Sequence, residues 1–174
     1  MAVVSDSGPL IALERIEQLR LLPELFTQII IPPAVEKEVA SLRKLPDWVL
    51  VQPLRQPLKL ARLGLSLGAG EREAIGLSLE IAASRLLVDD KAARRLARSL
   101  GLPIIGTLGL LLAAKRRRIL PTVRPYLDAL QKSSFHLTPH LYGRVLAEAG
   151  ETPPRSARKN LIDFNQICHI INQN

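Results

Sequence analysis

The chain has 174 residues, of which 47% are hydrophobic and only 3% aromatic, and it carries a formal net charge of +8. This size predicts one domain with an aliphatic core, and the basic charge favours polyanionic partners. The single cysteine, Cys168, excludes an intrachain disulfide. No apolar run approaches the roughly 20 residues of a membrane helix, and the N-terminus lacks a signal-peptide pattern. We therefore expect a cytoplasmic protein without membrane association.

Short apolar segments alternate with helical patterns along the chain. Strands are predicted at residues 2–5, 27–32, 48–53, 85–88 and 102–106. Apolar residues at helical spacing predict helices over residues 10–22, 32–42, 68–84, 90–101, 107–117, 121–131 and 138–149. This alternation predicts an α/β fold with a central parallel sheet of about five strands and helices on both faces.

Two segments do not fit the alternation. Residues 53–67 form a connector that contains proline and leucine. Residues 152–174 begin with Pro-Pro, turn basic and end rich in Asn and Gln, so we interpret them as an appended tail that is flexible or weakly helical.

Acidic and hydroxyl side chains gather where the predicted strands end. Asp6 follows the first strand, the adjacent Asp89 and Asp90 follow the fourth, and Thr107 follows the fifth. In an open parallel sheet the carboxyl ends of the strands form one edge, where ligands bind. These side chains are therefore predicted to lie at one edge of the sheet.

Glutamates on two helices extend this acidic group: Glu38 follows the second strand, and Glu71, with Glu73 beside it, precedes the fourth. Carboxylates that share a pocket raise each other's pKa, and a bound cation removes that penalty. Mg²⁺ and Mn²⁺ prefer such oxygen ligands. A divalent cation held by Asp6, Asp89 and Asp90 would therefore explain why two aspartates stand side by side.

Positive charge follows the aspartate pair. The segment from residue 91 to residue 118 contains no acid and eight basic residues, which are Lys91, Arg94, Arg95, Arg98, Lys115, Arg116, Arg117 and Arg118. An acidic pocket beside a basic surface is typical of a metal-dependent enzyme that acts on a nucleic-acid backbone.

Each candidate also has an ordinary explanation. Asp90 and Thr107 are good helix caps, and glutamates in a first helical turn favour the helix dipole. The sequence "GAGERE" lacks the third glycine of a dinucleotide loop, and His136 and His140 have no third metal ligand nearby in the sequence. The site hypothesis depends on the acids falling together at one edge.

Five stretches together resemble the PIN domain, the nuclease fold of VapC-type toxins, and more narrowly a bacterial and archaeal PIN-like branch. They are "VVSDSGPLIAL", "IIIPPAVEKEVA", "GAGEREAIGLSLE", "LLVDDKAARRLARSLGLPIIGTLGLLLAAKRRRIL" and "FHLTPHLYGRVLAEAGE". The resemblance covers residues 2–151, which we take as the domain. It implies a three-layer α/β/α fold and a Mg²⁺- or Mn²⁺-dependent endoribonuclease that is the toxin of a toxin–antitoxin pair.

The resemblance also implies roles for residues. The catalytic residues would be Asp6, Glu38, Glu71 and Asp90, and the metal ligands Asp6, Asp90, Asp89 and Glu71, with Glu73 an open alternative to Glu71. Thr107 and Ser7 would orient these ligands. The RNA backbone would be bound by Lys91, Arg94, Arg95, Arg98, Lys115 and Arg116. The implied partners are RNA, a cognate antitoxin and a second copy of the chain.

Two alternatives remain. In the first, a PIN-like module keeps the fold and binds RNA or a protein without cutting, and substitutions in the metal site then leave binding unchanged. A phosphoryl-transfer domain is less well supported, because "SGP" follows Asp6 and no lysine closely follows "IIGT".

Overall fold

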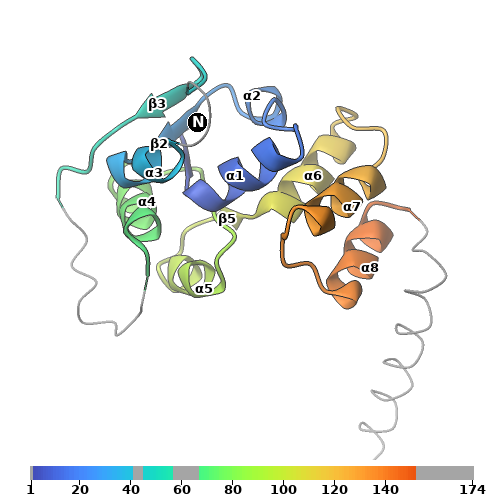
Figure 1. Cartoon of the computed structure of the whole chain (residues 1–174). Helices are drawn as coiled ribbons and strands as arrows, with labels where there is room; N and C mark the ends of the chain where they lie inside the picture. The colour runs from blue at the N-terminus through green and yellow to red at the C-terminus, as the bar shows by residue number, and fades with distance from the viewer. Residues whose placement is uncertain (1, 41–44, 57–66, 152–174) are drawn as a thin grey trace, which may run out of the picture. The chain divides into compact units, whose positions relative to one another are not determined.

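The structure is a computed structural model that describes residues 2–40, 45–56 and 67–151 (Figure 1). The described residues form five strands: β1 (Val3–Ser5), β2 (Ile29–Ile31), β3 (Val49–Val51), β4 (Arg85–Leu87) and β5 (Ile104–Ile105). They also form eight helices: α1 (Ser7–Arg15), α2 (Leu21–Leu25), α3 (Pro33–Glu38), α4 (Ala69–Glu80), α5 (Lys91–Ser99), α6 (Thr107–Arg116), α7 (Arg124–Lys132) and α8 (Pro139–Glu148).

The five strands form one parallel sheet in the order β3-β2-β1-β4-β5. Both the strand positions and the parallel sheet predicted from the sequence are therefore confirmed. The order runs outward from β1 through β2 to β3 and then returns to β4 on the other side of β1. Since parallel crossovers are right-handed, this reversal places the crossover helices on opposite faces and gives the three-layer α/β/α fold. The topological switch point lies between β1 and β4.

Aliphatic side chains fill the core of this sheet. Val4 of β1, Leu87 of β4 and Leu77 of α4 are fully buried. Helix α4 packs against both strands. Near-continuous apolar strands such as these are typical of a parallel sheet covered on both faces.

One predicted helix is wrong. The helix expected over residues 10–22 begins earlier, at Ser7, and ends at Arg15, and α2 starts only at Leu21. Glu17 has a positive φ of 56°, which ends the helical path. The apolar spacing continues through this turn because Ile16 and Leu21 are also buried, so the pattern alone does not reveal the break.

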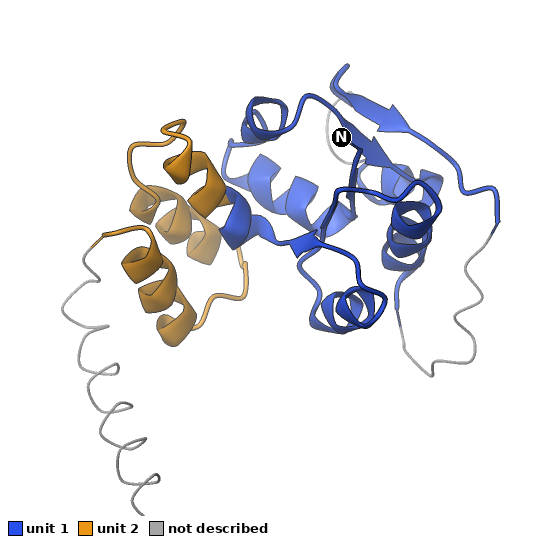
Figure 2. Cartoon of the chain, turned by 180° about the vertical axis from the view of Figure 1, so that it is seen from behind, with its two compact units in different colours: residues 1–110 blue, residues 111–174 orange. Residues whose placement is uncertain are grey.

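The chain divides into two compact units, with the boundary inside α6 after Leu110 (Figure 2). Unit 1 holds the sheet and all of the predicted acids. Unit 2 holds the rest of α6, together with α7 and α8. The predicted tail at 152–174 and most of the predicted connector lie outside the described residues.

Glu151 holds unit 2 together at the end of the described chain. It accepts hydrogen bonds from Lys115 Nζ at 2.5 Å, from the Val123 N–H at 2.7 Å and from the Arg124 N–H at 3.1 Å. Burial alone would raise the pKa of Glu151, but these donors outweigh the effect of burial and lower the pKa.

Among the described helices, none has the length and apolarity needed to cross a membrane.

Candidate active site

Asp6 lies at the carboxyl end of β1, where the chain turns into α1. Its backbone N–H donates to the Leu87 carbonyl of β4 at 2.9 Å, which fixes it at the switch point. The residue is only 4% exposed, and its Oδ1 has no hydrogen-bond partner among the described residues. A buried polar atom without a hydrogen-bond partner requires an explanation. A bound ion or a catalytic role provides such an explanation.

Burial raises the pKa of the Asp6 carboxyl to about 7. The N–H groups of Ser7 and Gly8, at the start of α1, lower this pKa in part, whereas the carboxylates of Glu71 and Glu38 raise it further. Glu71 and Glu38 are therefore close enough to repel Asp6, as expected for acids gathered at one edge of the sheet.

Glu38 ends α3 and contacts the start of α4. Its Oε1 accepts a hydrogen bond from the Gly70 N–H at 2.9 Å. A Cβ atom at residue 70 would lie 2.5 Å from Glu38 Oε2, so the carboxylate approaches this backbone closely only because residue 70 is glycine.

Glu73 has a different neighbour. Its Oε2 accepts from the Ala34 N–H at 2.9 Å, so α3 and α4 each cap the start of the other. Glu71 folds toward Gly68 at the start of its own helix and raises the pKa of Asp6. Of the two glutamates between which the sequence leaves the choice open, the structure thus places Glu71 in the acidic group with Asp6.

Asp89 follows β4 and is held by the start of α6. Its Oδ1 accepts from the Thr107 N–H at 2.8 Å, and its Oδ2 accepts from Thr107 Oγ1 at 2.5 Å. Burial raises the pKa of Asp89, although the two bonds from Thr107 and the charge of Arg94 lower it in part. Thr107 is fully buried, and its two hydrogen bonds hold this carboxylate. The resemblance implies an orienting role of this kind, which stays a prediction.

Asp90 points elsewhere. Its Oδ1 accepts from the N–H groups of Ala92 and Ala93, both at 2.8 Å, and caps α5. The residue is exposed. The structure therefore gives Asp90 the ordinary role of a helix cap and brings Asp89 instead to the switch point, so the metal-ligand role predicted for Asp90 stays a prediction that this geometry does not favour.

Gly8 separates the carboxylates of Asp6 and Asp89. A Cβ atom at residue 8 would lie 3.6 Å from Asp6 Oδ2 and 3.9 Å from Asp89 Oδ2, so the two carboxylates border the space that a side chain would fill. Ser7, predicted to orient the ligands, opens α1 and places its N–H near the Asp6 carboxylate. This space between two acids lies where open α/β sheets bind ligands.

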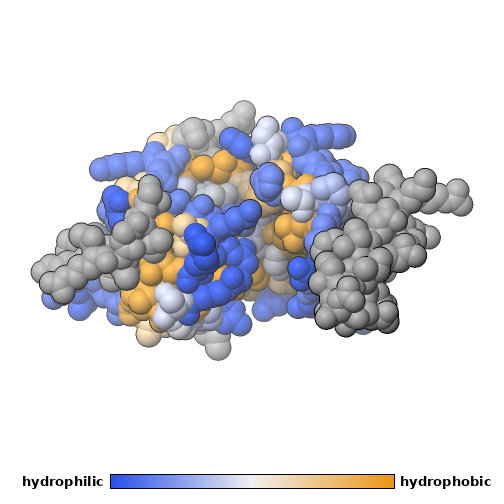
Figure 3. Space-filling view, turned by 90° about the horizontal axis from the view of Figure 1, so that it is seen from below, coloured by the Kyte–Doolittle hydropathy of each residue, from blue (hydrophilic) through white to orange (hydrophobic). Residues whose placement is uncertain are grey.

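Five of the six basic residues predicted to bind RNA fall into two groups. Lys91, Arg95 and Arg98 of α5 are exposed. Figure 3 views the molecule from the side on which α5 lies, and hydrophilic side chains project there between apolar patches. In unit 2, Lys115 pairs with Glu151 and Arg116 pairs with Glu148. These two cations, predicted to bind RNA, therefore have carboxylate partners within the protein.

The sequence patterns did not indicate the glycines of the site. Gly8, Gly70 and Gly106 each lie where a carboxylate approaches the backbone. The available signal was a glycine within two residues of a candidate side chain, as in "DSG", "GAGE" and "IIGT". This sequence pattern does not indicate which carboxylate approaches the glycine.

The donors at this edge suit a hard divalent cation. They are carboxylate oxygens, one of them buried without a partner, and Mg²⁺ commonly binds through one or two carboxylates with water and substrate phosphate completing its shell. Among the described residues, however, no group of three or more His, Cys, Asp or Glu side chains is placed to hold one ion. The residues thus fit a cation bound by two aspartates and completed by other ligands, but not a closed cage of protein ligands.

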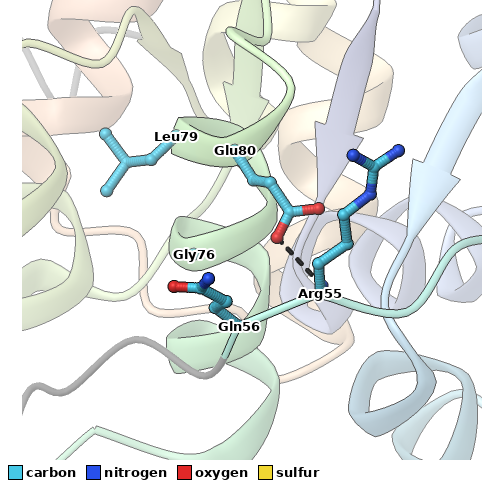
Figure 4. Close-up of a pocket in the computed structure, with 5 residues that line it drawn as sticks. All are labelled: Arg55, Gln56, Gly76, Leu79 and Glu80. Carbon is cyan, nitrogen blue, oxygen red and sulfur yellow. Dashed lines mark hydrogen bonds between the residues drawn. The ribbon is translucent and has the colours of Figure 1, made fainter.

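A pocket of about 370 Å³ lies elsewhere in unit 1. Figure 4 shows its lining residues, with the Arg55 N–H donating to Glu80 Oε2 at 2.9 Å. The lining consists of Arg55, Gln56, Gly76, Leu79 and Glu80. No predicted site residue contributes to it, so this pocket is separate from the acidic group.

Comparison with protein families identifies a matching family. The family model DUF3368, described as a PIN domain, matches residues 2–151. No curated protein and no solved structure matches the chain. PIN domains are generally nucleases and typically bind divalent metals. With a parallel five-stranded sheet, a buried Asp6 and a partly buried Asp89 at its switch point, and a family match over residues 2–151, the chain belongs to the PIN-domain family.

Proposed function

We propose that the protein is a Mg²⁺- or Mn²⁺-dependent endoribonuclease. The observation that carries the proposal is Asp6, a buried carboxylate with an unpartnered oxygen at the switch point, beside Asp89. A protein keeps such a group where function requires it, because the arrangement costs stability.

The side chains divide the work of hydrolysis. A bound cation would neutralise charge on the phosphate and lower the pKa of water. Asp6 and Asp89 would hold this cation, and Thr107 keeps Asp89 in a fixed orientation through two hydrogen bonds. We assign to Glu71 the role of accepting a proton from the attacking water, since it is only partly buried and lies near enough to raise the pKa of Asp6.

The exposed face of α5 would bind the RNA backbone. Lys91, Arg95 and Arg98 are spaced four and three residues apart, which places them on one side of the helix. Phosphate contacts of this kind do not depend on base sequence and weaken with salt. Substituting any one of the three is expected to reduce the salt dependence of RNA binding by about 0.7 in the log–log slope.

Cleavage of a labelled RNA by the full chain in Mn²⁺, Mg²⁺ or EDTA tests this function. We expect cleavage only with metal and its loss in Asp6→Asn and Asp89→Asn, whereas Asp90→Asn, which keeps a capping side chain, remains active. Equal activity in all variants would identify a contaminating nuclease. RNA binding without cleavage by any of them would favour the non-catalytic module.

We further propose that the protein is a toxin controlled by an antitoxin and that it forms a homodimer. The resemblance to VapC-type toxins supports both. Expression of the wild-type chain should slow growth, and co-expression of a small protein from a neighbouring gene should restore it. Normal growth without that protein would argue for a role in RNA processing. Light scattering of the purified chain tests the dimer.

A further inference from the structure

Arg94 differs from the other basic side chains of α5. It is partly buried, whereas Lys91, Arg95 and Arg98 are exposed. Its charge lowers the pKa of Asp89, so the guanidinium lies within Coulombic reach of that carboxylate. Helical spacing alone would group Arg94 with its exposed neighbours, but the structure directs it toward the acidic group.

Gly106 makes this arrangement possible. A Cβ atom at residue 106 would lie 2.7 Å from Asp89 Oδ1, 3.3 Å from the Val88 carbonyl and closest of all to Arg94 Nη1. Arg94 and Asp89 thus face each other across Gly106, without a direct ion pair between them. Any larger residue at position 106 has to displace one group or both.

We propose that Arg94 is a positioning residue for Asp89, which it holds together with Thr107, and that it does not contact the RNA backbone. This inference rests on the proposed function, because it assigns to Asp89 a place in that site. The site gathers several carboxylates in a region of low solvent access, where like charges repel. A fixed guanidinium offsets part of that repulsion and keeps Asp89 against the start of α6.

Two observations support a role through Asp89. Thr107 donates two hydrogen bonds to the Asp89 carboxylate, one from its backbone N–H and one from its hydroxyl. Both donors are neutral, so the nearby guanidinium of Arg94 supplies the positive charge beside this carboxylate. The long arginine side chain crosses from α5 to the loop before α6, a reach that a shorter residue lacks. Contacts that orient a ligand in this way typically change metal affinity or activity by about 10–100-fold.

The matched pair Arg94→Gln and Arg95→Gln in the full chain separates the two roles. In EDTA, RNA affinity measured against salt should lose about 0.7 from its slope in Arg95→Gln and keep the wild-type slope in Arg94→Gln. In Mn²⁺, Arg94→Gln should lower kcat about 10–100-fold with KM unchanged, whereas Arg95→Gln should raise KM. Arg94→Lys keeps the charge and should recover part of kcat.

A third readout needs neither RNA nor cleavage. The Thr107 amide donates to Asp89, so its NMR shift should move in Arg94→Gln, while the Ala92 and Ala93 amides that Asp90 caps should stay in place. If the wild-type chain neither binds nor cuts RNA, the proposed function is wrong, and the NMR shift of the Thr107 amide then tests the role of Arg94 by itself. An unmoved Thr107 amide, or a reduced salt slope in Arg94→Gln, would overturn the inference.

Discussion

Replacing Asp6 by asparagine tests how much stability the fold loses by burying an ionised carboxyl. The pKa of Asp6 rises from an ordinary 3.8 to about 7 in the folded protein. The folded chain therefore binds the proton more tightly than the unfolded chain does. The contribution of Asp6 to stability should be highest at low pH, fall as the pH rises from about 4 to about 7, and level off above that range.

The size of the effect follows from the pKa difference. A rise of about 3 units corresponds to about 4 kcal/mol of lost stability at pH 8, at about 1.36 kcal/mol per unit. Asparagine cannot ionise and avoids this loss, but its amide introduces buried donors that cost about 1–3 kcal/mol when they lack partners. Asp6→Asn should therefore be about 1–3 kcal/mol more stable than wild type at pH 8 and less stable than wild type by about 1–3 kcal/mol at pH 4, where only the cost of the amide remains.

Urea unfolding in EDTA at the two pH values measures this difference. Asp90→Asn is the matched control: its side chain is exposed and asparagine is an equally good cap, so its stability should follow wild type at both pH values. A destabilised Asp6→Asn at pH 8, with an unchanged slope in urea, would refute the reasoning that Asp6 is buried against its electrostatic preference.

Three further substitutions probe contacts around the site and in unit 2. Thr107→Val removes the hydroxyl donor to Asp89 and should cost about 1.5–3 kcal/mol in urea unfolding, more at pH 8 than at pH 4, where Asp89 is closer to neutral. Glu151→Gln should cost about 1–3 kcal/mol at pH 7, and the difference should vanish as the pH falls through the lowered pKa of Glu151. Gly70→Ala should cost about 1–3 kcal/mol, because its Cβ overlaps the Glu38 carboxylate.

Matched variants make these results specific. Thr107→Ser keeps the hydroxyl and should not change the pH dependence of stability. Gly8→Ala adds a Cβ that meets only ordinary contacts at 3.6–3.9 Å and should be tolerated where Gly70→Ala is not. Equal stability of Glu151→Gln and wild type at pH 7 would contradict the role of this residue in unit 2.

Much of the fold follows from local patterns. The strands are short apolar segments between turn-forming residues, and Gly101, with a φ of 75°, ends α5 where the sequence places its end. The prediction failed over residues 10–22, because buried residues continue the helical spacing through the turn at Glu17. Periodicity reports which residues are buried, not whether the backbone between them is helical.

The candidate site was predictable at the level of strands but not of single atoms. Strand ends placed Asp6 with the Asp89 and Asp90 pair, because parallel strands end at one edge. Which of the two adjacent aspartates faces Asp6 depends on how the chain turns after β4 and on the position of Thr107, which β5 brings alongside. The inward direction of Arg94 depends on the same loop, which the spacing within α5 does not encode.

Manganese binding to the full chain tests the central claim most directly. Calorimetric titration of wild type, Asp6→Asn, Asp89→Asn and Asp90→Asn at pH 8, with folding checked by circular dichroism, compares the acids one by one. The account predicts saturable binding to wild type and Asp90→Asn, and binding weakened at least about tenfold in Asp6→Asn and Asp89→Asn. Unchanged binding in Asp6→Asn, or binding lost only in Asp90→Asn, would contradict a cation site formed by Asp6 and Asp89.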